Sequence, residues 1–208
     1  MKLRHYKIPV AGFSLTELLV VLIISALLVS GLFMFLKKQR GSSVQQRLIA
    51  DTESLAQIAF FIIGRDIRRA GSNPAGVLGS APGTDLAIPL AAANQIELKA
   101  DLSGDGIIDP ALDEDITYSY TDSDMDGIPD QVVRQAGPGS SLVIKDIRAF
   151  DLSYQLVGTN VFVSSTNSPS LIRVVRLHMK AGTGRIDPDT GREHQKEVQM
   201  DFMLRNFR

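Results

Sequence analysis

The fold of this chain is decided by residues 12–24, which read Gly-Phe-Ser-Leu-Thr-Glu-Leu-Leu-Val-Val-Leu-Ile-Ile. The segment is apolar except for one carboxylate, Glu17, and the apolar run continues to Leu36, interrupted only by two serines and a glycine. A helix over residues 18–36 would be about 28 Å long. The hydrocarbon core of a bilayer is roughly 30 Å thick, so the sequence predicts a membrane-spanning helix with a charge at its mouth.

A short basic leader with Lys2, Arg4 and Lys7 precedes the apolar run. This order is typical of a secretory signal peptide, but the apolar core of such a peptide is usually about 7–15 residues long. The run in this chain is longer and shows no small-residue cleavage site behind it. An uncleaved signal anchor is the simplest alternative, yet it leaves Glu17 unexplained, because a carboxylate at mid-helix costs about 2.5–3.5 kcal/mol on insertion and less near an end.

Residues 12–18 resemble the class III signal of type IV prepilins and pseudopilins, in which Gly precedes Phe and Glu occupies the fifth mature position. The resemblance implies that a prepilin peptidase cleaves between Gly12 and Phe13 on the cytoplasmic side, and that Phe13 is then N-methylated. It also implies that Glu17 pairs with the N-terminal amine of a neighbouring subunit during assembly. The apolar run would then remain as an anchor in the bacterial inner membrane.

The helix is expected to continue beyond the membrane to Ala70, because Gly71 is a candidate C-cap and Pro74 prevents continuation. Gly41 is a weak point in this helix, since glycine costs about 1 kcal/mol relative to alanine. Apolar residues at helical spacing predict the face that packs on the rest of the protein. These residues are Val44, Leu48, Leu55, Ile58 and Ile62.

Residues 65–71, Arg-Asp-Ile-Arg-Arg-Ala-Gly, resemble the end of this helix in PilW-type minor pilins. A simpler account is that basic residues in a last helical turn complement the helix dipole. That account explains Arg68 and Arg69 but is indifferent to the other residues of the segment.

The remainder of the chain is predicted to be a β-rich head. A surface connection rich in Gly and Pro spans residues 71–93, and alternating polar and apolar residues follow it. The expected strands are residues 95–100, 116–121, 131–134, 142–147, 150–156, 172–179 and 197–204. Polar loops are expected at residues 157–170 and 181–195.

The predicted fold class is α+β and type IV pilin-like, with a long N-terminal helix, membrane-embedded in its first half, packed on an antiparallel β-sheet head domain. The expected segments are a leader peptide (1–12), a transmembrane and assembly helix (13–36), an amphipathic helix (37–70) and the globular head (71–208).

An acidic loop at residues 122–130 has the spacing of a calcium-binding loop, with carboxylates at positions 1, 3, 5 and 9 and Gly at position 6. The predicted ligands are Asp122, Asp124, Asp126, the backbone carbonyl of Ile128, and Asp130. An EF-hand would have Glu at position 12, where this loop has valine, so the helix-loop-helix interpretation fails. The pattern instead resembles the loops of thrombospondin type 3 repeats.

Residues 101–109 form a weaker copy of this pattern. The second set of predicted metal ligands is Asp101, Ser103, Asp105 and Asp109. The neighbouring acidic residues Asp113, Glu114 and Asp115 are candidates to close either site. The alternative is that both segments are hairpin loops, because Asp-Gly is itself a strong turn signal.

Composition excludes several functional classes. The chain has no cysteine, which excludes disulfides and thiolate sites, and its net charge of −1 argues against a nucleic-acid surface. Its three histidines, His5, His178 and His194, belong to no catalytic motif. The sequence therefore predicts a protein that is not an enzyme.

The function implied by the resemblance is that of a PilW-like minor type IV pilin, which initiates or caps pilus assembly together with other minor and major pilins. It would sit in the inner membrane with a periplasmic head and then enter the pilus, with the tip as one possible place on the cell surface. A minor pseudopilin of a type II secretion system is the alternative within the same class. A membrane-anchored, calcium-binding adhesive module is the alternative from another class.

Overall fold

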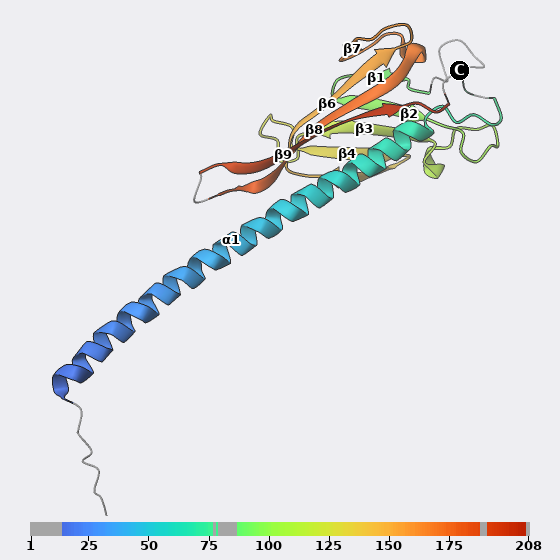
Figure 1. The fold of residues 1–208 in the computed structure, drawn as a ribbon. Coiled ribbons are helices and arrows are strands. Elements are labelled where there is room, and N and C mark those ends of the chain that lie inside the picture. The colour runs from blue at the N-terminus through green and yellow to red at the C-terminus, as the bar shows by residue number, and fades with distance from the viewer. Residues whose placement is uncertain (1–13, 77, 79–86, 188–190, 207–208) are drawn as a thin grey trace, which may run out of the picture. The chain divides into compact units, whose positions relative to one another are not determined.

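The structure is a computed structural model that describes residues 14–76, 78, 87–187 and 191–206. The chain divides into two compact units, Met1–Arg47 and Leu48–Arg208. The described residues form one long helix, nine strands and two short 3-10 helices (Figure 1). Their bounds are α1 Leu15–Arg69, β1 Leu90–Ala91, β2 Gln95–Lys99, η1 Pro110–Leu112, β3 Asp115–Thr121, β4 Gln131–Ala136, β5 Gly139–Ile144, β6 Ile147–Leu156, β7 Phe162–Val163, η2 Pro169–Leu171, β8 Ile172–Ile186 and β9 Glu193–Met203.

Helix α1 runs from Leu15 to Arg69 and passes Gly41 without interruption. No proline occurs within it, Glu17 lies in its first turn, and basic residues occupy its last turn, so the charges at both ends complement the helix dipole. Gly71 adopts a left-handed conformation with φ of 75°, which ends the helix as predicted. The N–H of Gly71 then donates to the carbonyl of Lys99, which ties the helix end to β2.

The strands form two antiparallel sheets. Sheet A has the order β1-β2-β3-β4-β5 and sheet B has the order β7-β6-β8-β9. The α+β architecture of a long N-terminal helix with antiparallel sheets is therefore confirmed, with two sheets where the sequence suggested one. The strand predicted at residues 142–147 is confirmed only for residues 142–144, which end β5. Its continuation is wrong, because the chain turns between β5 and β6 and Asp146 takes a φ of 57° there. This turn is where the chain leaves sheet A for sheet B.

The loop predicted at residues 181–195 is also wrong, because much of it is a β-hairpin formed by the ends of β8 and β9. Glu193 holds this part of the hairpin together. It pairs with Arg148 of β6 at 2.8 Å and accepts the N–H of Gly184 at 2.7 Å. The described residues near the tip are mostly exposed, so they show no alternation of buried and exposed positions from which a strand could be recognised.

The face of α1 that packs on the sheets differs from the predicted face. The buried apolar side chains of the helix are those of Ala56, Ala59, Phe60, Ile63 and Ile67. Leu48 and Ile62 are half-buried, whereas Val44, Leu55 and Ile58 are exposed. A Cβ atom at Gly64 would collide with the ring of Phe202 in β9, so the glycine allows the close approach of helix and strand. The small residues of the helix therefore select the packed face.

A buried carboxylate joins α1 to sheet A. Asp66 accepts a hydrogen bond from the Tyr118 hydroxyl at 2.7 Å and is paired with Arg134 Nε at 3.1 Å. Arg65, one residue earlier on the helix, also donates to it at 2.9 Å. Burial raises the pKa of Tyr118, and the adjacent Asp66 carboxylate raises it further. The hydroxyl therefore stays a proton donor to Asp66.

Candidate functional site

The predicted processing site lies at the start of the chain. Gly12 and Phe13 lie outside the described residues. Glu17 lies in the first turn of α1 and is exposed, and its Oε2 accepts the backbone N–H of Ser14 at 3.4 Å. This single long hydrogen bond caps the helix N-terminus. It leaves most of the carboxylate's hydrogen-bonding capacity available to a partner.

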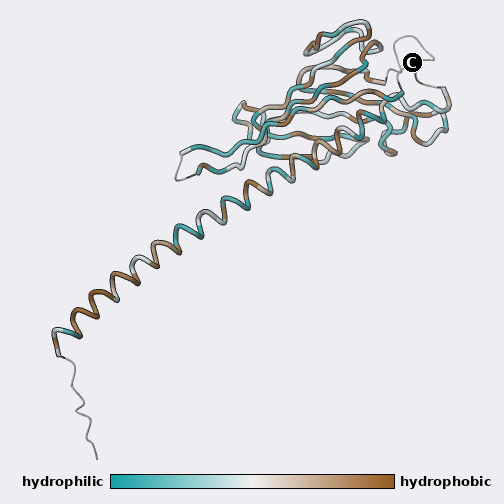
Figure 2. The backbone as a smooth tube through the Cα atoms, viewed as in Figure 1, coloured by the Kyte–Doolittle hydropathy of each residue, from teal (hydrophilic) through white to brown (hydrophobic). Residues whose placement is uncertain are grey.

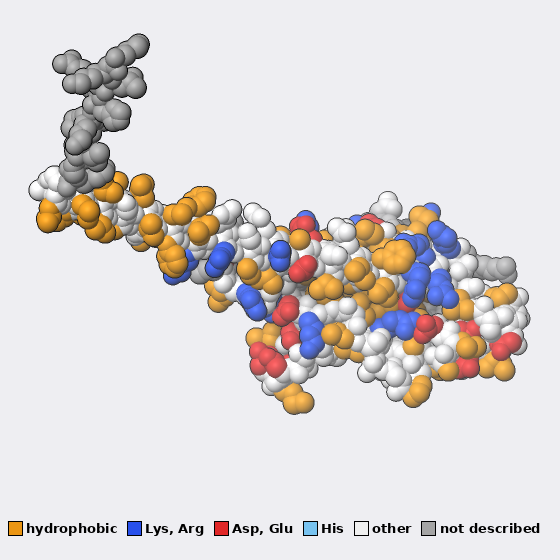
Figure 3. Space-filling model, turned by 90° about the horizontal axis from the view of Figure 1, so that it is seen from below, with side chains coloured by type: hydrophobic (Ala, Val, Ile, Leu, Met, Phe, Trp, Pro, Cys, Tyr) orange, Lys and Arg blue, Asp and Glu red, His pale blue; other side chains and the backbone are white. Residues whose placement is uncertain are grey.

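The apolar run behind Glu17 is exposed over its whole length. Every large apolar side chain between Leu18 and Leu36 is at least 44% exposed. Figure 2 shows this run as the hydrophobic first half of α1, and Figure 3 shows apolar side chains along the face of the helix that it displays. By length and composition the helix is able to cross a membrane. A bilayer or the helices of other subunits would bury this surface.

A second set of exposed apolar side chains lies on α1 within the unit Leu48–Arg208. Leu55, Ile58 and Phe61 are 52%, 50% and 66% exposed. Their spacing places them together on one side of the helix. This stripe contains two of the residues that the sequence assigned to the packed face. The structure therefore leaves part of the predicted core face exposed.

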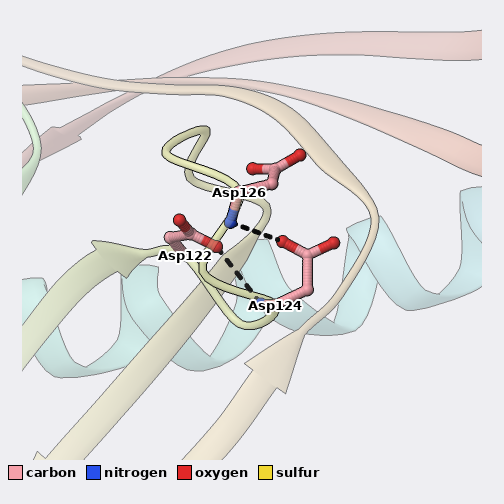
Figure 4. Close-up of side chains that lie close together, drawn as sticks. All are labelled: Asp122, Asp124 and Asp126. Carbon is pink, nitrogen blue, oxygen red and sulfur yellow. Dashed lines mark hydrogen bonds between the residues drawn. The ribbon is translucent and has the colours of Figure 1, made fainter.

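The loop at residues 122–130 brings three of its predicted ligands together. Asp122, Asp124 and Asp126 each offer an oxygen within 4.8 Å of the others (Figure 4). Asp130 does not join this group: its carboxylate accepts the N–H and the hydroxyl of Ser123 at 2.8 and 2.6 Å and so closes the loop. The side chain of the fifth predicted ligand, Ile128, is exposed. Calcium binding by this loop stays a prediction.

The charges of this loop influence one another. Slight desolvation raises the pKa of Asp122, but the N–H groups of Gly127 and Met125 lower it overall. For Asp124 the N–H of Asp126 lowers the pKa, whereas desolvation and the neighbouring carboxylates raise it overall. Desolvation is the largest of the causes that raise the pKa of Asp124, and the neighbouring carboxylates of Asp122 and Asp126 add to it.

The loop at residues 101–109 has the same local conformation. In both loops the carboxylate at position 1 accepts the N–H of position 4 at 2.7 Å, in one case Gly104 to Asp101 and in the other Met125 to Asp122. Positions 4 and 6 have positive φ in both loops. The two loops differ in burial, because Asp101 is buried and Asp122 is not.

Glu114 organises the 101–109 loop in a way that the sequence did not indicate. Its carboxylate is buried and accepts backbone N–H groups from Leu102, Ser103 and Asp109, at 2.8, 2.7 and 2.8 Å. Burial by itself raises the pKa of Glu114, but the three N–H groups lower it overall. Both carboxylate oxygens are therefore committed to the backbone.

Sequence reasoning missed an ionic row on the exposed side of sheet B. His178 lies between Asp151 and Glu197, with its ring nitrogens 3.1 and 2.9 Å from their carboxylates. Partial burial lowers the pKa of His178, but the two carboxylates raise it overall. The signal was absent because the three residues come from three different strands.

Comparison with known proteins assigns only the start of the chain. A family model described as the prokaryotic N-terminal methylation motif matches residues 9–33. The match includes the predicted cleavage position, Glu17 and most of the apolar run. No curated protein matches the chain.

Proposed function

Because the chain carries the N-terminal methylation motif that is typical of type IV prepilins and pseudopilins, we propose that it is a PilW-like minor pilin that initiates or caps pilus assembly. The motif implies processing by a prepilin peptidase and assembly with other pilins. Proteins with this motif are structural rather than enzymatic. The proposal adds to this the PilW-type role, the cleavage position between Gly12 and Phe13, and the place of the head in the periplasm and then in the pilus.

The observation that carries the proposal is Glu17 at the start of an exposed apolar helix. An intramembrane carboxylate is costly and normally has a partner. The bond to Ser14 is long and satisfies only part of the carboxylate. A free amine at Phe13 of a neighbouring subunit is the charged donor that such a carboxylate requires. Pairing of the two groups would set the register of one subunit against the next.

The apolar stripe of Leu55, Ile58 and Phe61 supports the same proposal. These side chains remain exposed although the opposite side of the helix is buried. Exposed apolar side chains that share one side of a helix mark an interaction surface when they are contiguous. In a pilus this side of α1 would contact the helices of neighbouring pilins.

The residues that support the PilW-type role lie at the end of α1. Residues 65–71 resemble the corresponding segment of PilW-type minor pilins, and Asp66 within it makes the buried contacts to Tyr118 and Arg134. The acid is thus needed to attach this helix end to sheet A. The resemblance therefore falls on a residue with a defined structural task.

The proposal predicts a defined mature N-terminus. Mass spectrometry of the protein purified from its native membrane is expected to find a chain that begins with N-methylated Phe13. A chain that begins at Met1 would refute processing and favour a plain signal anchor. A Glu17→Val variant is expected to be processed and methylated normally but to lose at least about tenfold in incorporation into pili, which corresponds to about 1.4 kcal/mol of lost pairing energy.

The control for this experiment is Ser25→Val, which changes a polar residue of the same apolar run away from the motif. This variant is expected to assemble normally. Cross-linking and pull-down from the native membrane then identify the partners. Recovery of pilus subunits supports the minor pilin role, whereas recovery of secretion-system subunits would assign the protein as a minor pseudopilin.

A further inference from the structure

Two buried carboxylates lie at the 101–109 loop without a cationic side chain to balance them. Asp101 is 0% exposed and Glu114 is 1% exposed. Among the described residues, no Lys, Arg or His forms an ion pair with either one. Buried carboxylates are ordinarily paired, neutralised or bound to a metal. The site therefore has an excess of negative charge.

The basic residues of the adjoining cavity already pair with other carboxylates. Arg69 and Lys99 line the small cavity beside Glu114. Arg69 lies 4.0 Å from the carboxylate of Asp66, and Lys99 lies 3.4 and 3.5 Å from those of Glu97 and Asp115. Neither cation forms an ion pair with Asp101.

One oxygen of Asp101 is buried without a hydrogen-bond partner. Oδ1 accepts the N–H of Gly104 at 2.7 Å and lies 3.5 Å from the hydroxyl of Ser103. Oδ2 has no partner among the described residues. Both oxygens belong to one carboxylate, so Oδ2 lies next to the loop that Oδ1 contacts. Most buried polar atoms have a hydrogen-bond partner, so this free carboxylate oxygen is a candidate position for a ligand.

The matching loop at residues 122–130 contains a hydrogen bond that the 101–109 loop lacks. There the second oxygen of Asp122 accepts the N–H of Gly127, the glycine at position 6, at 2.7 Å. The glycine at position 6 of the other loop is Gly106, and the Oδ2 of Asp101 takes no hydrogen bond from it. The exposed loop thus satisfies its first carboxylate internally, whereas the buried loop leaves an oxygen free.

The polar side chains of this loop carry only oxygen donors. The carboxylates of Asp101, Asp105 and Asp109 do not form a group within 4.8 Å of one another, as those of Asp122, Asp124 and Asp126 do. Ser103 offers a hydroxyl. Asp105 and Asp109 each use one carboxylate oxygen for a backbone N–H, from Ile107 at 2.9 Å and from Ala111 at 2.8 Å, and keep the other. Calcium takes about 6–8 oxygen ligands in flexible geometry, whereas magnesium requires a near-ideal octahedron. A loop of carboxylates and a hydroxyl with no nitrogen or sulfur donor fits calcium.

We propose that a calcium ion binds in the 101–109 loop, with Oδ2 of Asp101 as its buried ligand, and draws in Ser103, Asp105 and Asp109 as further ligands. Glu114 supports the loop through the backbone. The N–H of Asp101 also donates to the carbonyl of Ser72 at 2.8 Å, directly after the end of α1. The ion would therefore stabilise the junction between the helix end and sheet A. This inference does not depend on the role of the protein in a pilus.

The test is thermal unfolding of the full chain in detergent, in EDTA and in about 10 mM CaCl2, roughly ten times the upper end of the expected dissociation constants. For an affinity on the order of 10⁻⁴–10⁻³ M, calcium is expected to raise the Tm of the wild type by about 3–10 °C. Asp101→Asn removes the buried charge with little change of shape. In EDTA its Tm is expected to equal or exceed that of the wild type, and the rise with calcium is expected to disappear.

The comparison of Tm values in EDTA and in calcium distinguishes a calcium ligand from a residue that only stabilises the fold. A merely structural Asp101 would give D101N a lower Tm in EDTA as well as in calcium, which would overturn the proposal. The matched control is Asp122→Asn at position 1 of the exposed loop. This variant is expected to keep the part of the calcium-induced rise in Tm that depends on Asp101. Absence of any rise in the wild type, or loss of the whole rise in D122N, would also refute the site.

A second variant keeps the proposal testable if D101N does not fold. Asp105→Asn changes an exposed ligand and preserves the oxygen that accepts the N–H of Ile107. Calorimetric titration is expected to show a calcium dissociation constant at least about tenfold higher than that of the wild type, a typical cost of losing one charged ligand. An unchanged constant would exclude Asp105 and this loop as the site. Titration with MgCl2 is expected to give much weaker binding, and equal binding would overturn the assignment to calcium.

Discussion

Asp66 shows how much one residue contributes to the attachment of α1. Its side chain is buried and takes donors from the helix itself and from two strands of sheet A. The helix dipole account of the sequence explains the basic residues of the last turn but gives no role to an acid there. The structure supplies that role, because Arg134 and Tyr118 would otherwise be left without their buried acceptor.

The residue-scale prediction concerns this cluster. Tyr118→Phe removes one buried hydrogen bond and is expected to lower the free energy of unfolding by about 1–2 kcal/mol. Asp66→Asn removes the buried charge partner of Arg134 and leaves only the half-exposed Asp113, 3.0 Å from its guanidinium. This variant is expected to cost about 2–4 kcal/mol. Urea denaturation of the full chain in detergent, followed by circular dichroism, measures both values.

The control for the cluster is Tyr120→Phe, because the Tyr120 hydroxyl donates to the carbonyl of Ile147 at 3.2 Å at a half-exposed position. This variant is expected to change the free energy of unfolding by less than about 1 kcal/mol. A loss in Y118F no larger than that in Y120F would contradict the importance of the buried cluster.

At the scale of elements, the second half of α1 has two apolar sides, and hydrophobic spacing alone does not distinguish them. Its larger aliphatic residues at positions 55 and 58 suggested one side, whereas the sheets pack on the side that contains Ala56, Ala59 and Gly64. A helix approaches a sheet most closely through small residues, and aromatic residues then fill the remaining space. Phe60 and Phe202 fill it in this structure.

The element-scale prediction uses two glycines of the same helix. Gly64→Ala places a methyl group against the buried ring of Phe202 and is expected to destabilise the protein by about 1–3 kcal/mol. At Gly41 no described residue beyond the adjoining helix lies within 4 Å of the place that a Cβ would take, so Gly41→Ala is expected to be neutral or to stabilise the helix by up to about 1 kcal/mol. Thermal unfolding of the two variants side by side measures the difference, and equal Tm values would contradict close packing at Gly64.

At the scale of the whole molecule, the pH dependence of stability follows from the ionic groups of the described part. Burial raises the pKa of Glu114, but backbone N–H groups lower it overall. Arg148 lowers the pKa of Glu193, and Arg176 lowers that of Asp201. Groups with lowered pKa contribute stability above their unfolded pKa, near 4, and lose it as the pH falls. The pKa of His178 is raised, so its contribution to stability is lost as the pH rises rather than as it falls.

The prediction for the whole molecule is a maximum of stability at mildly acidic pH. His178 contributes fully below its unfolded pKa of about 6.5 and loses this contribution as the pH rises through its higher folded pKa. Its partners are exposed, so the contribution is expected to be only about 0.5–1 kcal/mol. Tm is therefore expected to fall between about pH 6.5 and 8.5, and His178→Gln is expected to abolish this fall while keeping the loss of stability below about pH 4. Parallel profiles of Tm against pH for the wild type and the His178→Gln variant would contradict this role of His178.

Much of the fold was predictable because it depends on local patterns. The long helix follows from an unbroken helical segment with matching end signals, and the strands follow from alternation. The predictions failed where the signal is not local. The turn at Asp146 lies inside an apolar run, and the hairpin beyond residue 181 is polar because both of its sides are exposed.

The candidate sites show the same division. The spacing of carboxylates identified both acidic loops, and their matching conformations agree with that spacing. Sequence favoured the 122–130 loop because it contains more aspartates. Burial favours the 101–109 loop instead. Among the described loop carboxylates, only Asp101 combines full burial with an oxygen that lacks a partner. Carboxylate count is a property of the sequence, whereas desolvation depends on what the fold places around the carboxylate.

By itself the sequence determined the N-terminal methylation motif, the apolar run with Glu17 and the α+β class, because each depends on residues that are adjacent or regularly spaced along the chain. Only the tertiary structure decided which side of α1 is buried, which residues Asp66 binds, and which acidic loop holds unbalanced charge. Those properties depend on contacts between residues far apart in the chain, and such contacts set both the space available to a side chain and its exposure to water.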